Sequence, residues 1–128
     1  IKKNKLENNF KILGVIKFNE LMSLMKYSIA VINPSKSEGW SSTVEQAKSM
    51  GKLVLLSNLT VHKEQNPKRA FFFSTNNYLN LSKKIYELNQ TYSYKRELKF
   101  FNKAFEDTIK TKNNFILAYE KLIKKIAK

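Results

Sequence analysis

Two glutamates and a run of hydroxyl residues lie close together in the segment from Pro34 to Lys52, PSKSEGWSSTVEQAKSMGK. The carboxylate of Glu45 can accept two hydrogen bonds from a vicinal diol, as acidic residues do for ribose in dinucleotide-binding folds. Glu38 precedes the hydroxyl residues and is placed to bind a further polyol. Gly39 has no side chain, so a ligand can approach the backbone there. The pattern therefore predicts a site for a ligand that carries several hydroxyl groups.

The hydroxyl residues also mark the start of a predicted helix, which we expect from Ser41 to Met50. The first N–H groups of a helix have no partners within it, and together with the helix dipole they favour an anion, most often phosphate. The side chains that can add donors there are those of Ser41, Ser42 and Thr43. This corner of the chain thus offers places for ribose, phosphate and sugar.

A purely structural interpretation uses some of the same residues. A serine before a helix with an acid three residues later is typical of a capping box, and Ser42 with Glu45 fits that spacing. A capping box accounts for neither Glu38, Gly39 nor Trp40. The tryptophan can wedge the loop against a sheet, stack on a base, or do both. Both interpretations of the corner stay open on this evidence.

Apolar segments on either side of the corner predict the elements that position it. Strands are expected at residues 9–15, 28–33, 53–57 and 71–73, with helices after Asn19 and from Ser41. Apolar strands separated by helices indicate βαβ crossovers and a parallel sheet. Ligands of such sheets bind beyond the carboxyl ends of the strands, where the corner would lie. His62 and Glu64 fall in a predicted loop at the same edge, either as site residues or as residues that order the loop.

The last part of the sequence, about residues 77–128, is predicted to be helical. Three helices are expected, around residues 79–88, around 98–105 and from Phe115 onward, the last with a clear amphipathic stripe. We expect the segment from Glu97 to Lys128 to pack against the sheet. Residues 1–128 would then form one α/β domain, a Rossmann-like, doubly wound parallel sheet followed by helices.

Composition restricts the chemistry further. There is no cysteine and one histidine, and no acid cluster, so no metal site is expected. The net charge of +14 is spread along the chain. It indicates either a solvated basic surface or attraction to anions, such as a phosphorylated substrate, an anionic membrane surface or RNA. Because the chain starts at Ile1, we expect it to be part of a longer protein.

The segment from Leu13 to Gln65 resembles the carboxy-terminal, nucleotide-sugar-binding half of GT-B glycosyltransferases of the family 4 type. The matching residues are Leu13, Gly14, Pro34, Ser35, Glu38, Gly39, Glu45, Ala47, Gly51 and Glu64. One departure is that six residues separate the two glutamates, where the family commonly has seven. The family's basic residues for the diphosphate, and its acceptor domain, would precede Ile1, so no catalytic residue can be named and this fragment alone is expected to be inactive.

The resemblance implies a role for each residue of the corner. Glu45 would hold the ribose of the nucleotide, and residues 38–40 (Glu38, Gly39 and Trp40) would meet the donor sugar. Residues 41–43 (Ser41, Ser42 and Thr43) would hold the diphosphate. The implied reaction transfers a sugar from a nucleoside-diphosphate sugar to a glycan or lipid-linked acceptor, with retention and without metal or other cofactor.

The implied setting is cytoplasmic, with a peripheral position at the anionic inner face of a membrane as a further expectation. Two alternatives remain. One is a non-catalytic basic module that binds nucleic acid, which would need exposed aromatic side chains on a basic face. Because the aromatic residues lie mainly on apolar stripes, no nucleic-acid partner is expected. The other is a degenerate nucleotide-binding scaffold.

Overall fold

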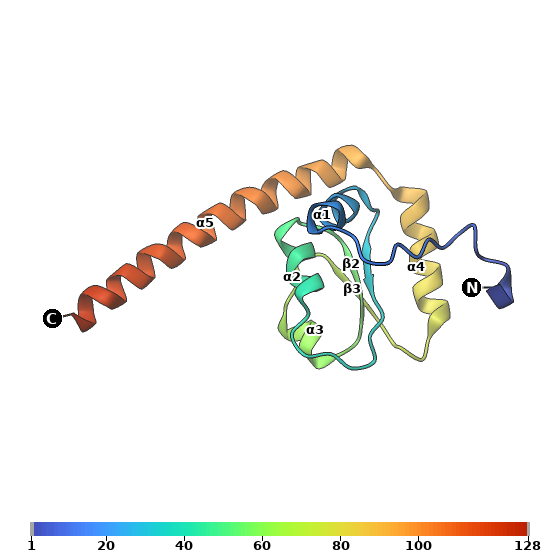
Figure 1. Cartoon of the computed structure of the whole chain (residues 1–128), viewed down its shortest axis with the longest axis horizontal. Helices are drawn as coiled ribbons and strands as arrows, with labels where there is room; N and C mark the ends of the chain where they lie inside the picture. Colours follow the sequence, from blue (N-terminus) through green and yellow to red (C-terminus); the bar gives the residue numbers. More distant parts are fainter. Residues whose placement is uncertain (1, 128) are drawn as a thin grey trace.

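The computed structural model describes residues 2–127, and a three-stranded parallel sheet lies at its centre (Figure 1). The strands are β1 (Val31–Asn33), β2 (Val54–Ser57) and β3 (Ala70–Phe73), side by side in chain order. Ile32 pairs with Leu55, and Leu55 pairs with Phe71. A helix follows each of the first two strands, so the carboxyl ends of all three strands lie at one edge. The predicted α/β, Rossmann-like fold with C-terminal helices is confirmed.

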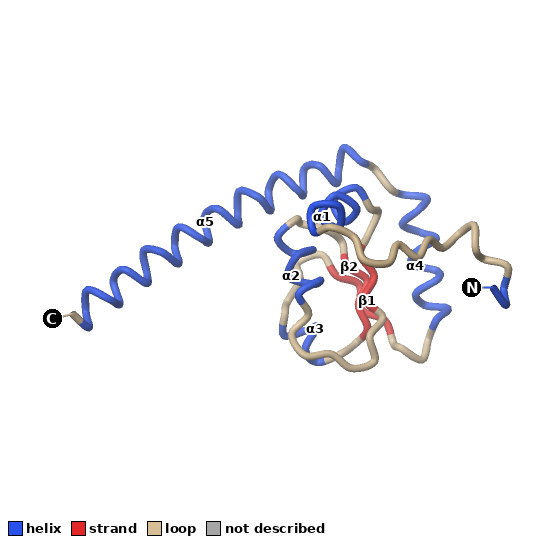
Figure 2. Tube along the Cα trace, in the orientation of Figure 1, coloured by secondary structure: helices blue, strands red, loops and turns tan. Residues whose placement is uncertain are grey.

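Helices surround this sheet, as Figure 2 shows in blue around the red strands. They are α1 (Phe18–Tyr27), α2 (Ser42–Ser49), α3 (Thr60–Glu64), α4 (Tyr78–Thr91) and α5 (Tyr94–Ile126), whereas a short 3-10 turn, η1 (Lys2–Asn4), lies away from the sheet (Figure 1). The helix expected from Ser41 to Met50 is therefore confirmed as α2. The helix expected after Asn19 begins slightly earlier, because Lys17 is its N-cap and the Glu20 carboxylate accepts a hydrogen bond of 2.8 Å from the Lys17 N–H.

The core lies on one face of the sheet. Val54 and Leu56 of β2 are fully buried and pack with Met25 of α1 and with Val44 and Ala47 of α2. Successive side chains of a strand point to opposite faces. Leu55, which lies between Val54 and Leu56 in β2, therefore faces α4. An apolar groove separates this helix from the sheet.

The strand expected at residues 9–15 does not form. Within the described residues, this segment is a loop, and Phe10, Ile12 and Val15 are exposed. A β-favouring composition indicates only that residues fit a half-buried pleated surface. No neighbouring strand supplies hydrogen bonds to this segment, so the composition alone does not produce a strand.

The two helices expected near residues 98–105 and from Phe115 are a single helix, α5, of 33 residues. Neither proline nor glycine interrupts residues 94–126, so nothing ends the helix between the two apolar stretches. The first half of α5 packs on α2, but the second half projects away from the sheet (Figure 1). Phe115 and Ile126 are exposed. The expectation that residues 97–128 pack against the sheet is therefore wrong for the second half of α5.

A buried ionic cluster fixes the first turn of α5. Glu97, only 8% exposed, accepts hydrogen bonds of 2.7 and 3.0 Å from the Arg69 guanidinium. The Lys52 ammonium lies 3.8 Å from the same carboxylate. Burial by itself raises the pKa of Glu97, but the two cations outweigh burial and hold that pKa below its usual value. The guanidinium also lies 3.7 Å above the ring of Phe100, so one arginine joins the sheet to two turns of α5.

Gly51, which ends α2, allows this close contact. Its φ of 61° is in the left-handed region that favours glycine. A Cβ atom built there would lie 2.5 Å from the carbonyl oxygen of Phe100 and 2.9 Å from the Cβ of Ala104. Because glycine has no Cβ atom, the backbone of α5 can cross close to the end of α2.

Candidate functional site

Glu38 lies at the carboxyl edge of the sheet, between the ends of two strands. The side-chain amide of Asn33, the last residue of β1, donates a 2.7 Å hydrogen bond to its Oε2. Nε2 of His62, in α3, lies 3.0 Å from the same oxygen. The Asn33 amide also reaches the Ser41 hydroxyl at 3.2 Å. The end of β1 and helix α3 thus hold one carboxylate through Asn33 and His62, and its side chain remains 24% exposed.

His62 is fully buried and spans the distance between β2 and Glu38. Its Nδ1 lies 2.9 Å from the carbonyl oxygen of Ser57, the last residue of β2, and 3.3 Å from the Ser57 hydroxyl. Burial by itself raises the pKa of Glu38, but hydrogen bonds, first from His62 and then from Asn33, outweigh it and lower that pKa below its usual value. An ionised carboxylate only accepts hydrogen bonds, so Nε2 of His62 must donate.

Glu45 lies on the first turn of α2 and has its own partner, Gln65, at the C-terminal end of α3. Nε2 of Gln65 donates to its Oε1 at 2.9 Å and to the carbonyl oxygen of Ser41 at 2.8 Å. The Lys48 ammonium lies 3.1 Å from Oε1 and 3.0 Å from Oε2 of the glutamate. The Glu45 side chain is 38% exposed, so it remains open to a ligand.

The capping box considered for Ser42 and Glu45 is not observed. Ser41 is the N-cap of α2, and no side chain caps the helix there. Glu45 uses its carboxylate for Gln65 and Lys48, as described above. The first N–H groups of α2 are therefore not satisfied by a side-chain cap. The anion site predicted at this corner stays a prediction.

The structure brings together most of the predicted site residues. Glu38, Ser41, Glu45 and His62 belong to one hydrogen-bonded cluster. Residues 39, 40, 42 and 43 (Gly39, Trp40, Ser42 and Thr43) are exposed around it. Glu64 is exposed on α3 and forms no hydrogen bond to the cluster.

Three members of this cluster were not predicted from sequence, namely Asn33, Ser57 and Gln65. The first two are the terminal residues of strands, a position that sequence could have indicated once the parallel sheet was expected. Gln65 follows His62 by three residues, which places both on one face of a helix. Because the segment was expected to be a loop, a spacing of three residues did not indicate a shared face. The structure shows that the segment is the helix α3.

Neither metal coordination nor membrane spanning has a candidate in the described part of the chain. Residues 2–127 contain no group of three or more histidine, aspartate and glutamate side chains that could hold a metal ion. None of the helices in this range is long and apolar enough to cross a membrane.

The parallel sheet and its helical crossovers place the chain in the α/β class, whose members commonly bind ligands at the carboxyl edge of the sheet. Residues 1–107 match the family described as glycosyl transferases group 1, and the chain belongs to this family. The resemblance inferred from sequence is thus confirmed, and the family places the chain's activity in glycosyl transfer. No curated protein and no solved structure matches the chain.

Proposed function

We propose that the chain is the donor-binding half of a retaining glycosyltransferase that builds cell-surface or other glycans. It would bind a nucleoside-diphosphate sugar, and the sugar would pass to a glycan or lipid-linked acceptor held by another part of a longer enzyme. The observation that supports this proposal best is the pair of glutamates at the carboxyl edge of the sheet. Glu38 and Glu45 are both partly exposed and are both fixed by buried hydrogen-bond donors.

Glu45 is assigned to the ribose because of its remaining hydrogen-bonding capacity. Its Oε1 accepts hydrogen bonds from Gln65 and Lys48, whereas Oε2 accepts only from Lys48. Each carboxylate oxygen can accept about two hydrogen bonds, so Oε2 can take a ribose hydroxyl. The adjacent ammonium adds positive charge beside the nucleotide.

Glu38 is assigned to the donor sugar on the same basis. Asn33 and His62 both donate to Oε2, so Oε1, which neither of them reaches, would take a sugar hydroxyl beside the Ser41 and Ser35 side chains. Because the pKa of Glu38 is lowered, the group is ionised at neutral pH and acts as an acceptor of hydrogen bonds. The exposed Gly39 and Trp40 follow directly and would form the remaining wall of the sugar subsite.

The diphosphate is assigned to the start of α2. The N–H groups of the first turn point toward the carboxyl edge of the sheet and are not capped by a side chain. Ser42 and Thr43 are exposed there, and the Ser41 hydroxyl lies beside them. Helix dipole and hydroxyl donors would stabilise the departing diphosphate without a metal ion.

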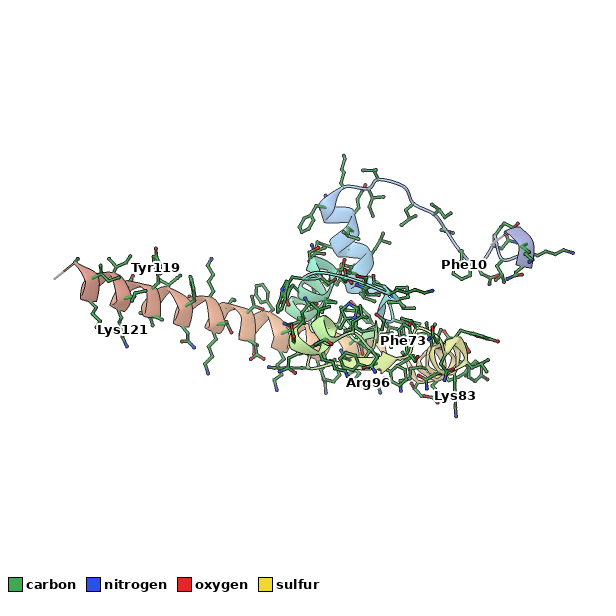
Figure 3. The ribbon with its side chains drawn as sticks, turned by 90° about the horizontal axis from the view of Figure 1, so that it is seen from below. Phe10, Phe73, Lys83, Arg96, Tyr119 and Lys121 are labelled. Carbon is green, nitrogen blue, oxygen red and sulfur yellow. The ribbon has the colours of Figure 1, made fainter. Side chains whose placement is uncertain are left out.

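We also propose that the chain works in the cytoplasm at an anionic membrane, and the second half of α5 supports the membrane contact. Its apolar side chains include Phe115, Tyr119, Leu122 and Ile126, and all are exposed. Tyr119 and Lys121 project to opposite sides of the helix (Figure 3). A basic, amphipathic helix of this kind can lie in the interface of a bilayer.

The same geometry disfavours the nucleic-acid-binding alternative. Phe115 and Tyr119 stack with ring centroids 6.1 Å apart, on the apolar side of α5. At 100° per residue, Lys121 and Lys124 lie on the other side of the helix. A single strand cannot stack its bases on one side and bring its phosphates to the other, so these aromatic residues do not form a stacking platform of the usual kind.

The proposal is tested by titrating the chain with UDP, GDP, ADP and their sugar conjugates in ligand-observed NMR. We expect selective binding of one nucleotide, lost in Glu45→Ala and retained in the control Glu106→Ala, an exposed acid on α5. Binding that survives Glu45→Ala would contradict the ribose role. No binding of any nucleotide would contradict a complete donor site within this chain. Binding without sugar transfer in the longer protein would favour the degenerate scaffold.

A further inference from the structure

The short helix α3 contacts both carboxylates of the candidate site. It comprises five residues, with Gln65 as its C-cap. His62 bonds Glu38 and Gln65 bonds Glu45, at 3.0 and 2.9 Å respectively. The two side chains are three positions apart, so they leave the helix on the same face. One element with two contacts thus connects the two acids.

Neither of these α3 side chains is available to a ligand. His62 is fully buried and Gln65 is 2% exposed. Each also has a partner behind it, since Nδ1 of His62 can accept a hydrogen bond from the Ser57 hydroxyl at 3.3 Å and the Gln65 amide donates to the Ser41 carbonyl oxygen at 2.8 Å. The orientation of the Gln65 amide follows from chemistry, since its nitrogen faces two groups that only accept hydrogen bonds. Any effect of these residues on a ligand must therefore pass through the glutamates.

We propose that His62 and Gln65 are positioning residues with separate targets. His62 holds Glu38 in the orientation that receives the donor sugar, by donating a hydrogen bond from Nε2. Gln65 holds Glu45 in the orientation that receives the ribose. This inference rests on the proposed function of the two glutamates and adds to it a division of labour within α3.

The two roles separate in a comparison of two ligands, a nucleoside diphosphate and the corresponding nucleotide sugar. The ribose is present in both ligands, whereas the sugar is present in only one. In His62→Phe, we expect the affinity for the nucleotide sugar to fall roughly tenfold or more, because a hydrogen bond to a charged group is lost. The affinity for the nucleoside diphosphate should stay unchanged. In Gln65→Leu, both affinities should fall by the same factor.

Two further variants distinguish positioning from a general structural role. His62→Gln keeps an amide donor that can reach Glu38, and it should restore part of the lost affinity for the nucleotide sugar. Lys63→Ala changes an exposed residue of the same helix and should alter neither affinity. If His62→Phe weakened both ligands equally, the division of roles would be wrong, and the urea midpoint of each variant would show whether loss of folding is the cause.

A measurement without ligand tests the His62 contact directly in the unmodified chain. ¹⁵N NMR of the imidazole reports which ring nitrogen carries a proton, and we expect a proton on Nε2 at neutral pH. The Nε2 signal should move in Glu38→Gln and stay in place in Glu45→Gln. An unprotonated Nε2 would overturn the proposal. If no nucleotide bound but Nε2 were protonated and sensitive to Glu38, the proposed function would fail while the contact between His62 and Glu38 would stand.

Discussion

Removing the charge of Glu97 should strongly destabilise the chain. The Glu97→Gln substitution keeps the shape of the side chain but leaves Arg69 and Lys52 without their shared carboxylate. Breaking a buried ion pair by removing one partner costs about 3–5 kcal/mol of unfolding free energy. The Arg69 side chain is 20% exposed and also donates to the Gly51 carbonyl at 2.7 Å, so part of its hydrogen bonding is retained. We therefore expect Glu97→Gln to lower the unfolding free energy by an amount at the low end of this range, about 3 kcal/mol.

The assay is urea-induced unfolding followed by circular dichroism. Glu106→Gln is the matched control, because Glu106 is exposed on the same helix, and it should change the unfolding free energy by less than about 0.5 kcal/mol. The double variant Arg69→Met with Glu97→Leu should cost less than the sum of the two single changes, since it leaves neither charge of that pair unpaired. A Glu97→Gln variant within about 0.5 kcal/mol of the unmodified chain would refute the role assigned to this cluster.

Three further predictions concern the loop glycines, acid stability and the single tryptophan. Gly51→Ala should destabilise the chain by about 2 kcal/mol or more, because of its left-handed backbone and the clash with Phe100, whereas Gly39→Ala, with open space around it, should be close to neutral in urea unfolding. The pKa values of Glu38 and Glu97 are lowered in the folded chain, so their stabilisation is complete above about pH 4.5 and is lost as the pH falls through the folded values. Unfolding free energies measured between pH 6 and pH 3 should fall accordingly, and Glu38→Gln with Glu97→Gln should flatten the curve; an unchanged slope would contradict the stabilising contacts assigned to these two carboxylates. Trp40 is 63% exposed beside the proposed sugar subsite, so its fluorescence should shift to shorter wavelength with a nucleotide sugar and much less with the nucleoside diphosphate, and an equal response to both would place the sugar elsewhere.

The sheet and the corner at its edge were predictable because their signals are local. The apolar runs of β2 and β3 are short, and the helix between β1 and β2 has Ser41 before it and Gly51 after it. These signals depend only on residues that are close together in sequence. The positions of the two glutamates at the carboxyl edge follow from the topology of any parallel sheet.

The features that were not predicted depend on contacts between distant segments. Helix α3 has five residues, too few to be stable alone, and hydrogen bonds from His62 and Gln65 to other elements hold it. Residues 9–15 have a strand composition but no adjacent strand. The second half of α5 continues because nothing in its sequence stops it, and amphipathic periodicity alone does not say which surface will cover the apolar side.

Helix α5 is attached to the sheet and to α2 from Glu97 to Ala104 and projects freely beyond that point. From Ala104 to Ile126 the helix extends about 33 Å, at 1.5 Å per residue. A rotation of about 5° at the attachment would therefore displace the end of the helix by about 3 Å, the length of a hydrogen bond. Three side chains and one glycine at the end of α2 set that angle. A small change in the packing of these residues would consequently move the C-terminal end of α5 by a larger distance.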